Sequence, residues 1–177
     1  MKIFKKSNIF NLLVVLIIIL GLGLRLKNFN VLSVDGHSMR QTDTECVAYF
    51  LYNGKANFFK PKSCLMRPVS NTQGYFFLEM PFYESLIAIS YKIFGPEIWA
   101  ARLVNLLLYI IGVVALWKFL SGWIDKKVGL WGVIIYSLMP GSIFFVGHAI
   151  HPDAMAVSLI WVSLYLIYKF SQNNNFK

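Results

Sequence analysis

Residues 9–26 read IFNLLVVLIIILGLGLRL, an apolar run with a single charged side chain, Arg25. A helix needs about 20 mainly apolar residues to cross a bilayer, so this run predicts a membrane-spanning helix. Lysines precede it as in a signal peptide, but it ends in Gly-Leu-Arg-Leu-Lys and not in a small-residue cleavage site. We therefore expect an uncleaved first span.

The composition extends this prediction to the whole chain. Of its 177 residues, 57% are hydrophobic and only 14% are charged, whereas a soluble domain has about a quarter charged. The stretch 81–94 is too short to span and carries Glu84 and Lys92, so it predicts an interfacial helix. We expect an all-α polytopic membrane protein with one long outer loop, residues 28–80, and short interfacial helices in that loop. Beyond the first span, the predicted spans are residues 99–120, 128–146 and 154–170.

The distribution of charge predicts the orientation. Lysines precede the first apolar run and follow the second and fourth, and basic residues of short loops favour the cytoplasmic side. The N-terminus is then cytoplasmic, and residues 28–80 lie outside the plasma membrane. Of the eight acidic residues, only Asp125 is then cytoplasmic. The net charge of +9 is explained by orientation, and we expect no nucleic-acid partner because no basic face follows a groove.

The densest polar segment, residues 35–45, follows the first span. It holds three carboxylates, an imidazole and the guanidinium of Arg40. A carboxylate can take a proton from a hydroxyl or bind a divalent cation, and an arginine can grip a phosphate. The same residues also suit a helix start, with Thr42 or Asp43 as the first residue and Glu45 in the first turn. Both interpretations stay open.

Three further polar features lie near predicted span ends. Glu79 precedes Pro81, which suits the first turn of a helix. Arg102 and Asn105 share one face of the second span, where an arginine either binds phosphate or reaches the interface. The third feature, residues 148–153 (HAIHPD), holds two histidines and an aspartate. It resembles a metal-ligand set, but Asp153 also fits a helix start.

The two cysteines, Cys46 and Cys64, both fall in the outer loop. Their spacing does not indicate a zinc site. They can pair if the loop faces an oxidising compartment, or they can remain free thiols.

The order of these features resembles the GT-C membrane glycosyltransferases, and most closely the bacterial branch of the dolichyl-phosphate-mannose-protein mannosyltransferase group. That branch has an outer-loop motif, an acid-Pro-aromatic motif, an Arg-Leu pair opening a span, and a Pro-Asp entering a later one. The resemblance runs from Val34 to Phe170. The corresponding segments are residues 37–44 (HSMRQTDT), 79–83 (EMPFY), 102–103 (RL) and 151–153 (HPD).

The resemblance implies an enzyme that moves a sugar from a polyprenyl-phosphate donor to an acceptor glycan, lipid or protein. Asp43 would be the base, with Asp35 as its rival. The remaining implied roles are a divalent metal (Mg, Mn or Zn) held by Glu79, Asp153 and His148, donor phosphate binding by Arg40 and Arg102, and substrate contacts by His37 and Gln41.

Family members have about a dozen spans, so the resemblance also implies that these residues form the N-terminal part of a larger enzyme. The alternative functions are a non-enzymatic membrane subunit and an inactive truncated product. A small transporter fits less well, because its charged residues would lie inside the spans.

Overall fold

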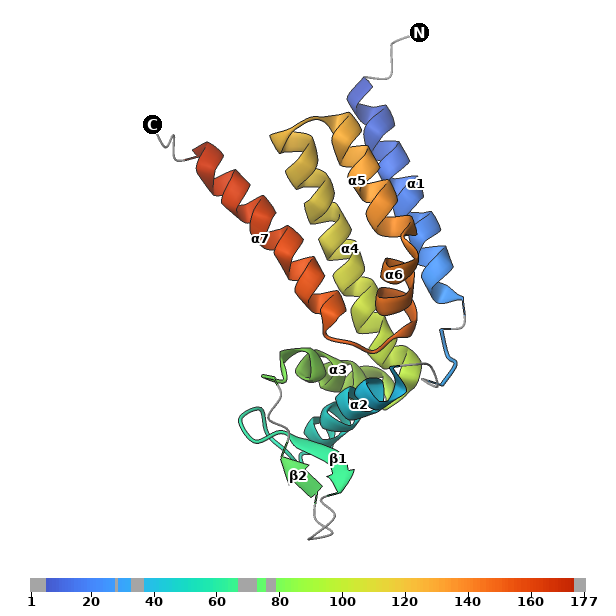
Figure 1. Ribbon diagram of the computed structural model, residues 1–177, viewed down its shortest axis with the longest axis vertical. Helices are drawn as coiled ribbons and strands as arrows, with labels where there is room; N and C mark the ends of the chain where they lie inside the picture. Colours follow the sequence, from blue (N-terminus) through green and yellow to red (C-terminus); the bar gives the residue numbers. More distant parts are fainter. Residues whose placement is uncertain (1–5, 28, 33–36, 67–72, 76–78, 174–177) are drawn as a thin grey trace.

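The computed structural model describes residues 6–27, 29–32, 37–66, 73–75 and 79–173 (Figure 1). Most of this part is helical, with one short antiparallel hairpin. The elements in chain order are α1 (Lys6–Leu26), α2 (Ser38–Tyr52), β1 (Lys62–Met66), β2 (Gln73–Tyr75), α3 (Phe82–Phe94), α4 (Ile98–Trp123), α5 (Lys126–Leu138), α6 (Pro140–Ile143), the π-helix η1 (Phe144–His148) and α7 (Asp153–Asn173).

Three helices, α1, α4 and α7, are each long and apolar enough to cross a membrane. A fourth crossing is complete if α5 is counted with the α6–η1 segment, from which it is bent by 59°. The predicted third span, residues 128–146, is therefore not one straight helix. The cause is Pro140, which lacks the amide proton that continues a helix and keeps the preceding Met139 extended (ψ 127°).

The spans run alongside one another, and the remaining elements gather at one end (Figure 1). The start of α1, the end of α7 and the α4–α5 turn lie at the opposite end. Helix α3 lies across the N-terminal end of α4. It has 13 residues, about 20 Å of helix, which is too short for a hydrocarbon core about 30 Å thick. The prediction that residues 81–94 do not cross agrees with this arrangement.

Helix α4 is the centre of the bundle. In its spanning window 56% of the residues are buried, against 17% in α1 and 11% in α7. One buried cluster joins α4 to α2 and α3 through Ala48, Tyr83 and Ile87. A second cluster joins α4 to α1, α5 and α7 through Tyr109 and Val133. The half-exposed apolar side chains of α1 face outward, where lipid would cover them.

The bend between α5 and α6 is held by Arg25 of α1, which is fully buried. Its guanidinium donates to the carbonyl oxygens of Gly21 and Ser137 (both 2.9 Å) and to Ser142 Oγ (2.7 Å). It also lies 3.9 Å from the centre of the Tyr109 ring. A helix end leaves carbonyl groups without amide partners, so the bend requires donors, and Arg25 supplies them.

The outer loop packs as a small unit against α2. The strands β1 and β2 pair in antiparallel fashion, and a disulfide joins Cys46 of α2 to Cys64 of β1. Of the two alternatives left open by the sequence, free thiols or a disulfide, the structure shows the disulfide. A second link is the hydrogen bond from Ser63 Oγ to Asp43 Oδ1 (3.0 Å). The disulfide and this bond fix β1 to α2.

Candidate functional site

The four polar segments singled out in the sequence meet at the N-terminal end of α4. We call this contact region, formed by residues 37–44, 79–84, 102–105 and 148–153, the junction. It contains an ion pair between Arg40 Nη2, in the first turn of α2, and Glu79 Oε1, just before α3. The two side chains are 25% and 30% exposed, so solvent and ligands can reach both.

Gln41 and His37 connect α2 to the segment before α7. Gln41 is fully buried, and its Oε1 accepts a hydrogen bond from the Ile150 amide (3.0 Å). The His37 ring lies against Phe145 (centroids 5.5 Å apart) and His151 (6.2 Å). Gln41 therefore has a structural partner, whereas exposed His37 lies among aromatic rings at the surface. Their predicted substrate contacts stay predictions.

Arg102 and Asn105 of α4 hold the backbone around the junction in place. Arg102 is 3% exposed and donates to the carbonyl oxygens of His148 (2.8 Å) and Phe29 (2.7 Å). Asn105 donates to the Ala149 carbonyl (2.7 Å) and accepts from the Tyr83 hydroxyl (2.7 Å). Burial raises the pKa of Tyr83 above its usual range, so the hydroxyl remains a neutral donor. Phosphate binding by Arg102 stays a prediction.

The sequence analysis did not predict a role for Glu84 in the site, because it noted this residue only as a charge on the interfacial helix 81–94 and as one of the outer acids. It is fully buried in the first turn of α3, and neither carboxylate oxygen has a hydrogen-bond partner within the described residues. Burial, with a contribution from the nearby charge of Glu79, raises its pKa to about 7. One signal was available: Glu84 lies on the same helix face as Ile87 and Ala88, which face the core.

The other predicted acids lie apart. Asp43 is partly buried and accepts from Ser63, while Asp153 is 61% exposed at the start of α7 with its Oδ2 3.1 Å from His151 Nδ1. His148 contributes its carbonyl oxygen to Arg102. Asp35 lies outside the described residues.

A metal centre does not fit the junction as described. Glu79 is bound to Arg40, Asp153 faces solvent, and the described ranges contain no group of three or more His, Cys, Asp or Glu placed to hold an ion. Metal ligands must come within about 2.0–2.6 Å of one ion. The divalent metal expected from the resemblance therefore stays a prediction, without support from these side chains.

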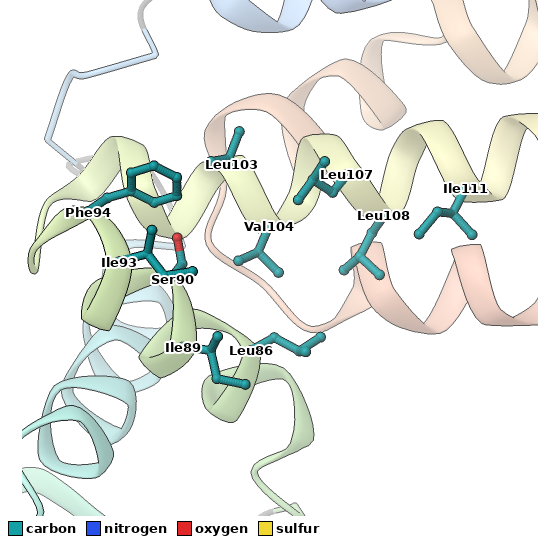
Figure 2. Close-up of a pocket in the computed structure, with 10 residues that line it drawn as sticks. All are labelled: Leu86, Ile89, Ser90, Ile93, Phe94, Leu103, Val104, Leu107, Leu108 and Ile111. Carbon is teal, nitrogen blue, oxygen red and sulfur yellow. The ribbon is translucent and has the colours of Figure 1, made fainter.

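An apolar groove of about 310 Å³ runs between α3 and α4 (Figure 2). Its one polar lining side chain, Ser90, donates its hydroxyl to the Ala100 carbonyl (2.7 Å) and so offers the groove little polarity. The lining residues are Leu86, Ile89, Ser90, Ile93, Phe94, Leu103, Val104, Leu107, Leu108 and Ile111. The groove thus begins at Leu86, about half a turn beyond Glu84 along α3.

Comparison with known protein families identifies the family of this chain. The family model described as dolichyl-phosphate-mannose-protein mannosyltransferase matches residues 79–177, more than half of the chain. The protein belongs to this family. It is therefore a multi-pass membrane protein of the GT-C type with a glycosyltransferase-like role. No curated protein and no solved structure matches the chain.

The family match begins at Glu79, at the start of the acid-Pro-aromatic segment. It includes Glu84, Arg102 and Asp153, whereas the outer-loop segment 37–44 precedes it. The resemblance of that earlier segment, with Arg40 and Asp43, stays a prediction. The structure nevertheless joins the two parts, because Arg40 binds Glu79 and Gln41 binds Ile150.

Proposed function

We propose that this protein acts in transferring a sugar from a polyprenyl-phosphate donor to an acceptor glycan, lipid or protein on the extracytoplasmic side. The observation that carries the proposal is the layout along α3. Ionisable groups, Arg40, Glu79 and Glu84, gather at the start of the helix, and the apolar groove follows the rest of it. A polyprenyl phosphate has the same layout, an anionic head on a long apolar tail.

Asp43 is the proposed general base. Its carboxylate would take the proton from the acceptor hydroxyl while that oxygen attacks the anomeric carbon of the sugar. The bond from this carbon to the phosphate oxygen breaks, and polyprenyl phosphate leaves with the bonding electrons. Ser63 would orient Asp43 through their hydrogen bond (3.0 Å). Asp35 is the alternative base.

Arg40 is the proposed phosphate ligand. Its guanidinium is held by Glu79, yet a quarter of the side chain is exposed, so it can exchange the carboxylate for a phosphate oxygen. Positive charge placed there offsets the charge that develops on the leaving phosphate. Arg102 would act less directly, because two of its donors hold carbonyl groups.

The test uses membranes from cells that express the protein and a radiolabelled polyprenyl-phosphate sugar. Asp43→Asn and Arg40→Gln are each expected to reduce transfer about a hundredfold, the range typical of a lost general base or charge-stabilising donor. Glu97→Gln is the matched control, because Glu97 is an exposed acid at the same end of the molecule. All variants are compared at equal membrane abundance.

Two results would reject the enzyme assignment. One is transfer that stays intact in both variants. The other is an equal rate of transfer in membranes that lack the protein, which would favour a non-enzymatic membrane subunit or an inactive product.

A further inference from the structure

Besides the apolar groove, a polar cavity of about 210 Å³ lies in the outer loop, between the turn after α2 and the hairpin. Three lysines, Lys55, Lys60 and Lys62, line it together with Asn57 and Tyr75. No aspartate or glutamate is among its lining residues. We call this cavity the lysine pocket. It belongs neither to the junction nor to the groove of Figure 2.

The backbone that carries the three lysines is held in place. The Lys55 amide donates to the Phe50 carbonyl at the end of α2 (3.0 Å). The Lys60 amide donates to the side chain of Asn57 (2.8 Å), and Lys62 is paired with Tyr75 in the hairpin. A pocket formed before a ligand arrives loses less conformational entropy on binding.

Membrane orientation does not explain these charges. The positive-inside preference acts within about 15–20 residues of a span, and all three lysines lie farther than that along the chain from both α1 and α4, so they have little effect on orientation. None of the three lysines is ion-paired with a carboxylate within the described part of the chain. Three lysines at one cavity give it a positive potential, which favours a bound anion.

The position of the pocket favours a ligand that arrives from outside the bilayer. The hairpin lies at the far end of the molecule from the spans (Figure 1). The pocket also precedes Glu79, where the family match begins, so it lies outside the segment matched to the family. Strand β1 connects it to the proposed base, because Ser63, which follows Lys62, donates to Asp43.

We propose that the lysine pocket binds a phosphate or carboxylate group carried by the acceptor. The identification of this ligand as the acceptor rests on the proposed function, whereas anion binding by the pocket does not. An anionic lipid headgroup shares the same chemistry, so the experiment must separate the two sources.

The first arm measures binding of oligogalacturonate, a soluble carboxylated oligosaccharide, to the purified chain in uncharged detergent. Neutral dextran oligosaccharide is the control ligand. We expect oligogalacturonate alone to bind, more weakly as salt screens the charges. The triple variant Lys55→Gln, Lys60→Gln, Lys62→Gln should weaken binding at least tenfold. Lys92→Gln, an exposed lysine outside the pocket, should leave it unchanged.

The second arm offers liposomes rich in phosphatidylglycerol, or made of phosphatidylcholine alone, to the same proteins. If only the phosphatidylglycerol liposomes bind in a lysine-dependent way, the ligand is a headgroup and the acceptor assignment is overturned. If neither anion depends on the three lysines, the pocket itself is overturned. Equal melting temperatures and an intact disulfide show that the triple variant is folded.

These measurements need no sugar donor. If the proposed function is wrong, the rate of sugar transfer is unchanged by Arg40→Gln. If this inference is wrong, anion binding is unchanged by replacement of the three lysines.

Discussion

Two arginines, Arg25 at the bend between α5 and α6 and Arg40 at the junction, have contrasting surroundings. Arg25 is fully buried and contacts two carbonyls, a hydroxyl and an aromatic ring. Within the described residues its Nε has no hydrogen-bond partner, and no carboxylate is paired with it. Arg40 is partly exposed, and its partner Glu79 is a charged side chain. The first arginine completes the architecture, while the second can change partners, and binding of a ligand requires that freedom.

The same contrast separates the acids. Glu84 is buried without a hydrogen-bond partner among the described residues, and Asp43 is partly buried beside Ser63. A buried carboxyl group favours its neutral form, whereas a more accessible carboxylate stays ready to accept a proton. Position relative to solvent therefore gives two carboxyl side chains different properties.

The largest expected effect is at the bend. Arg25→Met should lower the free energy of unfolding by about 3–5 kcal/mol, because the Ser137 carbonyl and the Ser142 hydroxyl at the bend lose their donor away from water. The measurement is thermal unfolding of the purified chain in detergent. Lys27→Met, an exposed position just after α1, should change it little. An unchanged melting temperature for Arg25→Met would show that the bend does not need this guanidinium.

The next effect is the pH dependence from Glu84. Its pKa of about 7 lies above that of an unfolded chain, about 4.3. Between these values the unfolded state has lost the proton and the folded state retains it. Stability from this group is thus full below about pH 4 and falls as the pH rises to about 7, by up to about 4 kcal/mol.

Glu84→Gln removes this group from the titration. The difference in melting temperature between pH 5 and pH 8 should therefore be smaller in Glu84→Gln than in the natural protein. Glu97→Gln should retain the natural difference, because that side chain is exposed. Identical pH profiles for Glu84→Gln and the natural protein would mean that Glu84 ionises normally in the folded state.

The smallest effect concerns Ser63, which contacts Asp43. Ser63→Ala should reduce sugar transfer about threefold to tenfold, which corresponds to about 1 kcal/mol, the typical net value of a single hydrogen bond. Melting should change little, since the disulfide between Cys46 and Cys64 still holds β1 to α2. Measuring kcat and KM separately sharpens the contrast, because a positioning role for Ser63 should lower kcat. A normal kcat would show that Ser63 of β1 does not position Asp43 for catalysis.

The segments that form the junction could be predicted from the order of the polar motifs and apolar spans along the chain. The segments containing Arg40, Glu79, Asn105 and Ile150 were each expected near the outer surface, and in the structure they contact one another. That this contact region lies on the outer side stays a prediction. The individual partners could not be predicted. Arg102 holds carbonyl groups of residues 46 and 73 positions away, and such distances leave no local pattern in a sequence.

Apart from the interfacial position of residues 81–94, which stays a prediction, the sequence by itself determined the membrane class and the approximate limits of the long apolar helices. These depend on the length and polarity of continuous stretches, which are local properties. Only the tertiary structure decided that Pro140 bends the third span around Arg25, that Cys46 joins Cys64, and that Glu84 is buried beside Glu79. These features depend on which distant groups share a space from which water is excluded, and that is settled only when the helices pack.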